Sequence, residues 1–122
     1  MVEAGIFLVD KPAGVSSFAV VARLRRILKM KKVGHAGTLD PFATGLLVLC
    51  AGRPATKLID SLMVGDKEYL ATAQLGVETD TQDSEGRILR QEAVPLYSPE
   101  LIESCLAAFR GRQLQTPPAF SA

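Results

Sequence analysis

A single carboxylate stands in a segment rich in glycine and proline, residues 33–45, and is the strongest candidate for chemistry. Asp40 precedes Pro41, whose ring fixes its own φ and restricts Asp40 to extended backbone. Gly34 and Gly37 permit close approach of a partner. A rigid loop that presents one aspartate suits a nucleophile or a general base. The alternative is an Asp-Pro turn with glycines for tight packing, and residue types alone favour that alternative.

Other kinds of reactive site find little support. His35 is the only histidine, so neither a Ser-His-Asp triad nor a His-pair metal site is predicted. Cys50 and Cys105 lie far apart without metal-ligand spacing, and no phosphate-loop pattern occurs. Residues 80–86 resemble a calcium loop in composition only, so a solvated hairpin turn is preferred. His35 lies in a basic, glycine-containing loop where it could stack on a nucleic-acid base, and the alternative is an exposed loop histidine.

Charge is distributed unevenly although the net charge is only +1. Between Asp10 and Asp40 the sequence has no acid and seven bases. A block of one sign indicates a surface that faces a polyanion, most often nucleic acid. The alternative is the solvated face of one helix, and charge alone does not decide between them. The seven bases are Lys11, Arg23, Arg25, Arg26, Lys29, Lys31 and Lys32.

Length and composition indicate one globular domain. The chain has 122 residues, of which 48% are hydrophobic and 22% are charged, and these values exclude a disordered or coiled-coil chain. Residues 1–5 carry an acid where a signal peptide carries bases, and the apolar run at 6–9 is too short for one. No apolar stretch is long enough for a membrane span. We therefore expect a soluble cytoplasmic protein without a membrane partner.

Hydrophobic periodicity and turn signals predict mixed α and β elements. Ser16 or Ser17 caps the first helix, which is basic at its end, and Ser98 followed by Pro99 begins the last one. The expected order is strand 5–10, the capped helix, loop 33–45, strand 45–51, a helix from Pro54 to about Met63, strand 68–75, polar loop 76–86, strand 87–92, a helix from Ser98 that Gly111 stops, and an extended tail from Gln113. Strands 68–75 and 87–92 are expected to pair antiparallel. This order favours the α+β class.

Residues 34–47, Gly-His-Ala-Gly-Thr-Leu-Asp-Pro-Phe-Ala-Thr-Gly-Leu-Leu, closely resemble the catalytic motif of the TruB family of RNA pseudouridine synthases. Four further segments resemble other family motifs in the expected order. They are residues 5–14 with the pair Lys11-Pro12, residues 52–57, residues 67–81 with Tyr69, and residues 115–122. The resemblance therefore runs across essentially the whole chain.

The resemblance implies a pseudouridine synthase-like fold, with a mixed, mainly antiparallel sheet flanked by helices, that is incomplete in this chain. Residues 1–122 would be the N-terminal portion of the catalytic domain. The remainder of that domain, an arginine that pairs with the catalytic aspartate, and a C-terminal RNA-binding domain would be absent. The alternative to an active enzyme is a catalytically silent RNA-binding or structural fragment that needs the missing C-terminal half.

The implied reaction isomerises a T-loop uridine of tRNA to pseudouridine, with no metal, no organic cofactor and no obligate protein partner. By resemblance, Asp40 is the catalytic nucleophile or base and Tyr69 is the second catalytic residue, which stacks on the target base. Two mechanisms fit the carboxylate: attack at C1′ or at the base ring, or proton removal at C2′. The residues implied in binding the RNA are His35, Lys11, Thr38, Lys29, Lys31 and Lys32.

Overall fold

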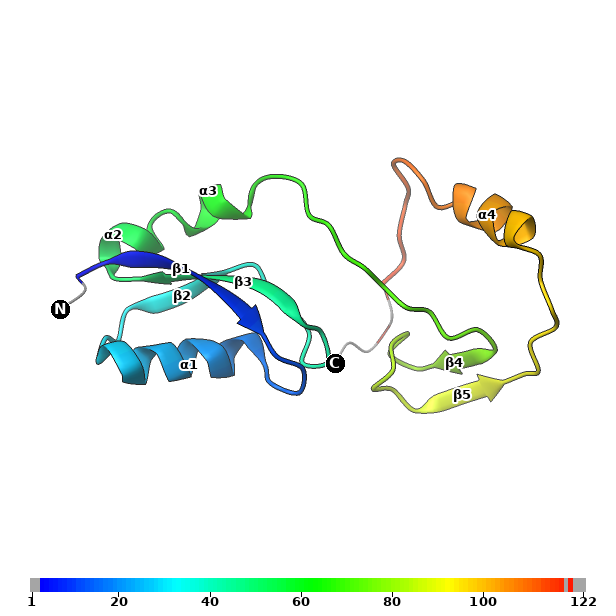
Figure 1. Ribbon diagram of the computed structural model, residues 1–122, viewed down its shortest axis with the longest axis horizontal. Coiled ribbons are helices and arrows are strands. Elements are labelled where there is room, and N and C mark those ends of the chain that lie inside the picture. The colour runs from blue at the N-terminus through cyan, green and yellow to red at the C-terminus, as the bar shows by residue number, and fades with distance from the viewer. Residues whose placement is uncertain (1–2, 118, 120–122) are drawn as a thin grey trace. The chain divides into compact units, whose positions relative to one another are not determined.

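The computed structural model describes residues 3–117 and 119 and divides the chain into two compact units, Met1–Tyr69 and Leu70–Ala122 (Figure 1). The first unit contains a three-stranded sheet, one long helix and two short ones. The second contains a two-stranded sheet and one helix. All strand pairs are antiparallel, which confirms the predicted α+β class with mainly antiparallel sheets.

The sheet of the first unit has the order β1-β3-β2, with β3 in the centre. Strands β1 (Gly5–Lys11) and β3 (Gly45–Ala51) pair along their whole length, so both strands that the apolar runs predict are present. β3 is largely buried as predicted, but β1 is an edge strand on which Ile6 and Leu8 are exposed, which corrects the prediction of a buried strand there. Strand β2 (Val33–Ala36) corrects the prediction of a loop over 33–45, because its four residues pair with the end of β3. Pairing with a neighbouring strand has overridden the low strand propensity of glycine there.

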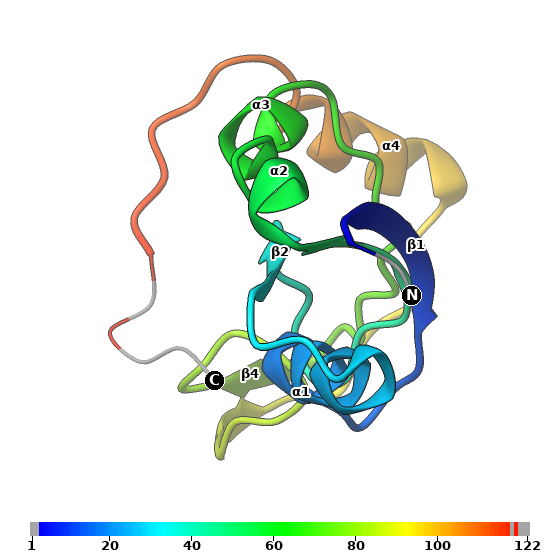
Figure 2. The ribbon, with the colours of Figure 1, turned by 90° about the vertical axis from the view of Figure 1, so that its left-hand side faces the viewer.

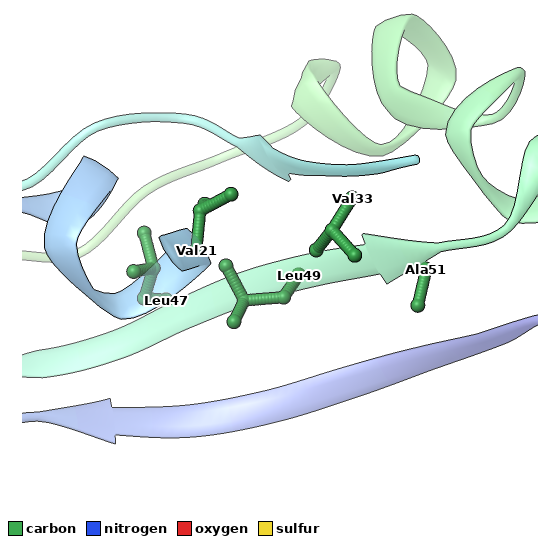
Figure 3. Close-up of a cluster of buried hydrophobic side chains, with 5 residues drawn as sticks. All are labelled: Val21, Val33, Leu47, Leu49 and Ala51. Carbon is green, nitrogen blue, oxygen red and sulfur yellow. The ribbon is translucent and has the colours of Figure 1, made fainter. Parts of the chain in front are cut away.

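Helix α1 (Ser17–Leu28) covers one face of this sheet, and the core of the unit lies between them. Ser16 is the N-cap, and its Oγ accepts a hydrogen bond from Ala19 N at 3.1 Å. The helix ends at Lys29, which adopts the left-handed conformation with φ of 51°. Figure 3 shows the five buried side chains of the core, which are Val21, Val33, Leu47, Leu49 and Ala51.

Two short helices, α2 (Arg53–Thr56) and α3 (Ile59–Met63), lie on the side of the sheet opposite α1 (Figure 2). They replace the single predicted helix from Pro54 to about Met63, which is interrupted after Thr56. A Cβ at Gly34 would lie 2.9 Å from Ile59 Cδ1, the flexible end of that side chain. α3 therefore approaches β2 closely at this glycine, and a larger residue there would require the Ile59 side chain to shift.

The second unit contains β4 (Val77–Thr79), β5 (Ile88–Gln91) and α4 (Pro99–Ala107). The predicted hairpin exists, but its first strand is not residues 68–75, because β5 pairs with Val77–Thr79 instead. The weak alternation of apolar side chains over 68–75 is present in the sequence, but these residues form no strand. The predicted polar loop 76–86 is correspondingly shorter.

Helix α4 begins as the sequence predicts, with Ser98 Oγ accepting from Leu101 N at 3.2 Å and Pro99 in the first turn. It ends at Ala107, before Gly111, which was expected to stop it. The predicted extended tail has no regular structure over residues 113–117, and its positions 118 and 120–122 lie outside the described residues. No helix within the described ranges is long and apolar enough to cross a membrane.

Candidate active site

Asp40 opens a tight turn between β2 and β3. Ala43 N donates a hydrogen bond to the Asp40 carbonyl oxygen at 3.0 Å, which closes a four-residue turn with Pro41 in its second position. Aspartate first and proline second is a preferred β-turn sequence, so the predicted Asp-Pro turn is present. The Asp40 residue is nevertheless exposed. The structural interpretation and the chemical one are therefore compatible, because the turn holds the backbone and leaves the side chain accessible.

The backbone directly before Asp40 is fixed by Ser17. The hydroxyl of Ser17 donates to the Leu39 carbonyl oxygen at 2.9 Å and accepts from Leu39 N at 3.0 Å. Ser17 is only 3% exposed, and the Leu39 side chain packs against the core cluster. Leu39 is thus attached to the body of the unit through both its backbone and its side chain.

The backbone directly after Asp40 is fixed by Lys11. Its Nζ donates to the carbonyl oxygens of Pro12, Val15 and Pro41 at 2.9, 2.8 and 3.1 Å. The Pro41 carbonyl also accepts from Gly14 N at 2.7 Å. These bonds join the turn to the connection between β1 and α1. Lys11 itself is 0% exposed.

This environment argues against the predicted RNA-binding role of Lys11. An ammonium group has three N–H donors, and all three are used within the chain. The side chain has no donor left for a phosphate and no exposed surface. We therefore remove Lys11 from the candidate RNA-binding residues and assign it to the support of the Asp40 turn.

The Asp40 carboxylate itself has no ion pair among residues 3–117 and 119. The three ion pairs found there are Arg87–Asp80, Arg90–Glu92 and Arg110–Glu103, and all belong to the second unit. The arrangement at Asp40 is that of an exposed carboxylate on a backbone anchored at both neighbouring residues. Such a group can act on a reactant that is brought to it from solvent.

His35 lies on β2, close in sequence to the same turn, and its ring is oriented. Its Nδ1 lies 2.6 Å from the Gly37 carbonyl oxygen. A carbonyl only accepts hydrogen bonds, so Nδ1 carries the proton and Nε2 remains for another partner. Gly37 has a φ of +89°, a conformation that side chains rarely adopt. The glycine is thus required by the local loop geometry. Thr38 is exposed in this loop.

The three lysines predicted to bind RNA after the first helix are not at the Asp40 turn. Lys29, Lys31 and Lys32 are exposed after the C-terminal end of α1, whereas Ser17 at its N-terminal end contacts the turn. Twelve residues of helix separate these ends, which corresponds to about 18 Å at 1.5 Å per residue. Arg25, another of the seven bases, has a structural role, because its Nη2 donates a hydrogen bond to the Val33 carbonyl oxygen at 2.8 Å.

No hydrogen bond among residues 3–117 and 119 links Tyr69 to the Asp40 turn. Tyr69 is the last residue of the first unit, it is 67% exposed, and it lies outside the strands. Its catalytic role stays a prediction. Within the described part of the chain, no three His, Cys, Asp or Glu side chains gather as metal ligands.

Sequence reasoning missed the role of Ser17. It identified Ser16 and Ser17 as alternative helix caps, and only one of two adjacent serines can occupy the cap. The second hydroxyl then lies in the first turn of the helix and needs another partner when it is buried. Tandem serines before an apolar helix were therefore the available signal, although their partner, Leu39, is distant in sequence.

Known proteins resemble this chain in sequence. A family model described as TruB family pseudouridylate synthase (N terminal domain) matches residues 25–122. The tRNA pseudouridine synthase B of Desulfotalea psychrophila is 67% identical over 119 residues, which are 98% of this chain and 48% of the relative. The enzyme of the same name from Protochlamydia amoebophila is 49% identical over 118 residues, covering 97% of this chain and 45% of the relative.

Solved structures include similar chains. A chain of the archaeal box H/ACA sRNP Nop10-Cbf5 complex is 44% identical, with a TM-score of 0.45 over 47% of this chain and 18% of that one. A chain of an H/ACA RNP bound to a substrate RNA containing 2'-deoxyuridine is 40% identical, with the same TM-score and coverage. This chain spans about half the length of the curated relatives it matches. On the family match and the identities with these relatives, the chain belongs to the TruB family of pseudouridine synthases.

Proposed function

We propose that the full-length protein carrying this chain is a cytoplasmic enzyme that isomerises a T-loop uridine of tRNA to pseudouridine. Residues 1–122 are proposed to form the N-terminal portion of its catalytic domain. Membership of the family supports the reaction class. The observation that carries the assignment of a residue is the Asp40 carboxylate, which is exposed on a turn anchored by Ser17 and Lys11.

The proposed reaction breaks the bond from C1′ to N1 of uracil, rotates the base, and forms a bond from C1′ to C5. The hydrogen on C5 leaves as a proton, and N1 takes up a proton from solvent. Substrate and product are isomers, so no net oxidation takes place. Asp40 serves either as a nucleophile at C1′ or at the base ring, or as the base that removes the C2′ proton. Each route requires the carboxylate to touch the nucleotide. The target uridine must therefore leave its stack and enter the site, and an exposed turn is accessible to it.

The remaining candidates are proposed as RNA contacts. His35 has its Nδ1 committed to Gly37, so its Nε2 and ring edge are available to the RNA near the extruded nucleotide. Thr38 is proposed to donate to the RNA backbone, and Tyr69 to stack on the target base. Lys29, Lys31 and Lys32 are proposed to contact phosphates at a distance from the reaction.

Tritium release tests the function directly. Isomerisation detaches the hydrogen on C5, so tRNA labelled with tritium at C5 of its uridines should release about one equivalent of label per molecule. Transcripts with each T-loop uridine replaced in turn by cytidine identify the position. We expect release to be lost for one of these transcripts only. Release that persists in all of them would contradict the T-loop assignment, and no release from any tRNA would contradict the function.

Neutralising the basic end of α1 should weaken binding without slowing the reaction. In the triple variant Lys29→Gln, Lys31→Gln and Lys32→Gln, the salt slope of tRNA binding should fall by about two to three units, because each lost phosphate contact removes slightly less than one. Since these residues lie about a helix length of 18 Å from the end of α1 that contacts the Asp40 turn, kcat at saturating tRNA should stay within about twofold of wild type.

A control variant distinguishes specific contacts at the end of α1 from a general effect of the protein's net charge. Arg53→Gln, Lys57→Gln and Lys67→Gln remove three exposed bases of the same unit. We expect this control to change the salt slope by less than about one unit. Equal effects of both triple variants would show that net charge matters and that the end of α1 is not a specific contact.

A further inference from the structure

We propose that Ser17 is a positioning residue for Asp40. Its hydroxyl bonds to both backbone groups of Leu39, the residue before Asp40. It therefore fixes the backbone from which the Asp40 side chain projects. This inference rests on the proposed catalytic role of Asp40 and adds a residue to it. Ser17 itself is not expected to touch the RNA, because it is 3% exposed.

The two hydrogen bonds define the position of Leu39 more tightly than one would. A hydroxyl has one donor and two acceptor sites, so it can donate to Leu39 O at 2.9 Å while accepting from Leu39 N at 3.0 Å. Together they fix the peptide groups on either side of the Leu39 Cα. Rotation of the backbone at Leu39 would break at least one of them. Because the site is buried, water does not readily replace the lost bond.

The hydroxyl is itself mounted on a rigid element. Ser17 is the first residue of α1, whose start is fixed by the Ser16 cap and whose next turn contributes Val21 to the core. Leu39 packs against the same core cluster. The position of Asp40 is therefore determined by α1 and the core as well as by the loop. A displacement of about 1 Å at a reacting group can reduce the rate by about a hundredfold.

The competing explanation is that Ser17 only stabilises the fold, and Ser16 provides the matched control. Both serines lie at the start of α1, and each accepts one backbone N–H: Ser16 from Ala19 and Ser17 from Leu39. Ser16 is exposed, and within the described part of the chain its hydroxyl bonds to Ala19 N and not to the Asp40 turn. The variants Ser16→Ala and Ser17→Ala therefore both remove a hydroxyl that accepts one backbone N–H, but only Ser17→Ala releases Leu39.

The experiment compares these variants in the full-length protein with labelled tRNA. For Ser17→Ala we expect kcat to fall about ten- to a hundredfold while the Kd for tRNA stays within twofold. For Ser16→Ala we expect kcat within twofold of wild type, together with a loss of thermal stability from the missing helix cap. If Ser17→Ala and Ser16→Ala lower kcat equally, or if Ser17→Ala retains kcat within twofold, the inference is wrong.

Amide hydrogen exchange supplies a readout that does not depend on activity. In the wild type the Leu39 amide should be protected, and Ser17→Ala should accelerate its exchange at least tenfold, while Ser16→Ala should accelerate exchange at Ala19 instead. An unprotected Leu39 amide in the folded wild type would overturn the inference even if Ser17→Ala failed to fold. The variant Asp40→Asn separates the two proposals. If it is inactive while Ser17→Ala is normal, only the inference fails, and if it is active, the proposed function of Asp40 fails.

Discussion

Replacing Asp40 by asparagine in the full-length protein is expected to lower pseudouridine formation about a thousandfold or more, with the Kd for tRNA within about twofold of wild type. An amide has nearly the shape of the carboxylate but can neither attack carbon nor accept a proton at neutral pH. Asparagine is also well suited to the first position of the turn, so the turn that Ala43 closes is retained. The measurement is tritium release under single-turnover conditions, together with filter binding of the same tRNA.

The structure argues that the loss would be chemical and not a folding defect. Asp40 is exposed, and its carboxylate takes part in none of the ion pairs of the described residues, so the substitution should change the free energy of unfolding by less than about 0.5 kcal/mol. Asp60→Asn, at an exposed aspartate on α3, is the matched control and should keep wild-type turnover. Turnover by Asp40→Asn within tenfold of wild type would contradict the assignment.

Elements with local signals could be predicted from the sequence, and those that depend on distant partners could not. Apolar runs located β1 and β3, and a serine followed by proline located the start of α4. Strand β2 was missed because it depends on contacts with residues distant in sequence, namely its pairing with β3 and the packing of Ile59 against Gly34. Conversely, residues 68–75 have a strand-like pattern but no pairing.

The same difference between local signals and distant partners applies to the candidate site. The motif around Asp40 and its proline identified the exposed carboxylate and the turn that presents it. The anchors of that turn, Ser17 and Lys11, are 22 and 30 residues away from the backbone groups they hold. Residue type suggested a cap for one and a phosphate contact for the other. Only the fold shows that both are buried and directed at the residues flanking Asp40.

The two explanations for Lys11 predict different results for one substitution. Lys11→Met keeps the length and volume of the side chain but removes the ammonium group. The Pro41 carbonyl would keep its bond from Gly14 N, whereas the Pro12 and Val15 carbonyls would lose the Nζ donor. Pro12 is exposed and Val15 is half-buried, so water can replace part of what these acceptors lose. An acceptor left without a partner costs about 1–3 kcal/mol when it is buried, and removal of the cost of burying a charge offsets part of this. We expect the free energy of unfolding to fall by about 1–2 kcal/mol.

Urea denaturation of the full-length protein measures that change, and Lys57→Met, at an exposed lysine of the same unit, should change the unfolding free energy by less than about 0.5 kcal/mol. If Lys11 instead bound phosphate, its substitution would leave stability unchanged and lower the salt slope of tRNA binding by about one unit. Because all three N–H groups of Lys11 are used on carbonyls within the chain, we expect the first result and an unchanged salt slope. The opposite pair of results would return Lys11 to the RNA-binding surface and leave Ser17 as the anchor of the Asp40 turn.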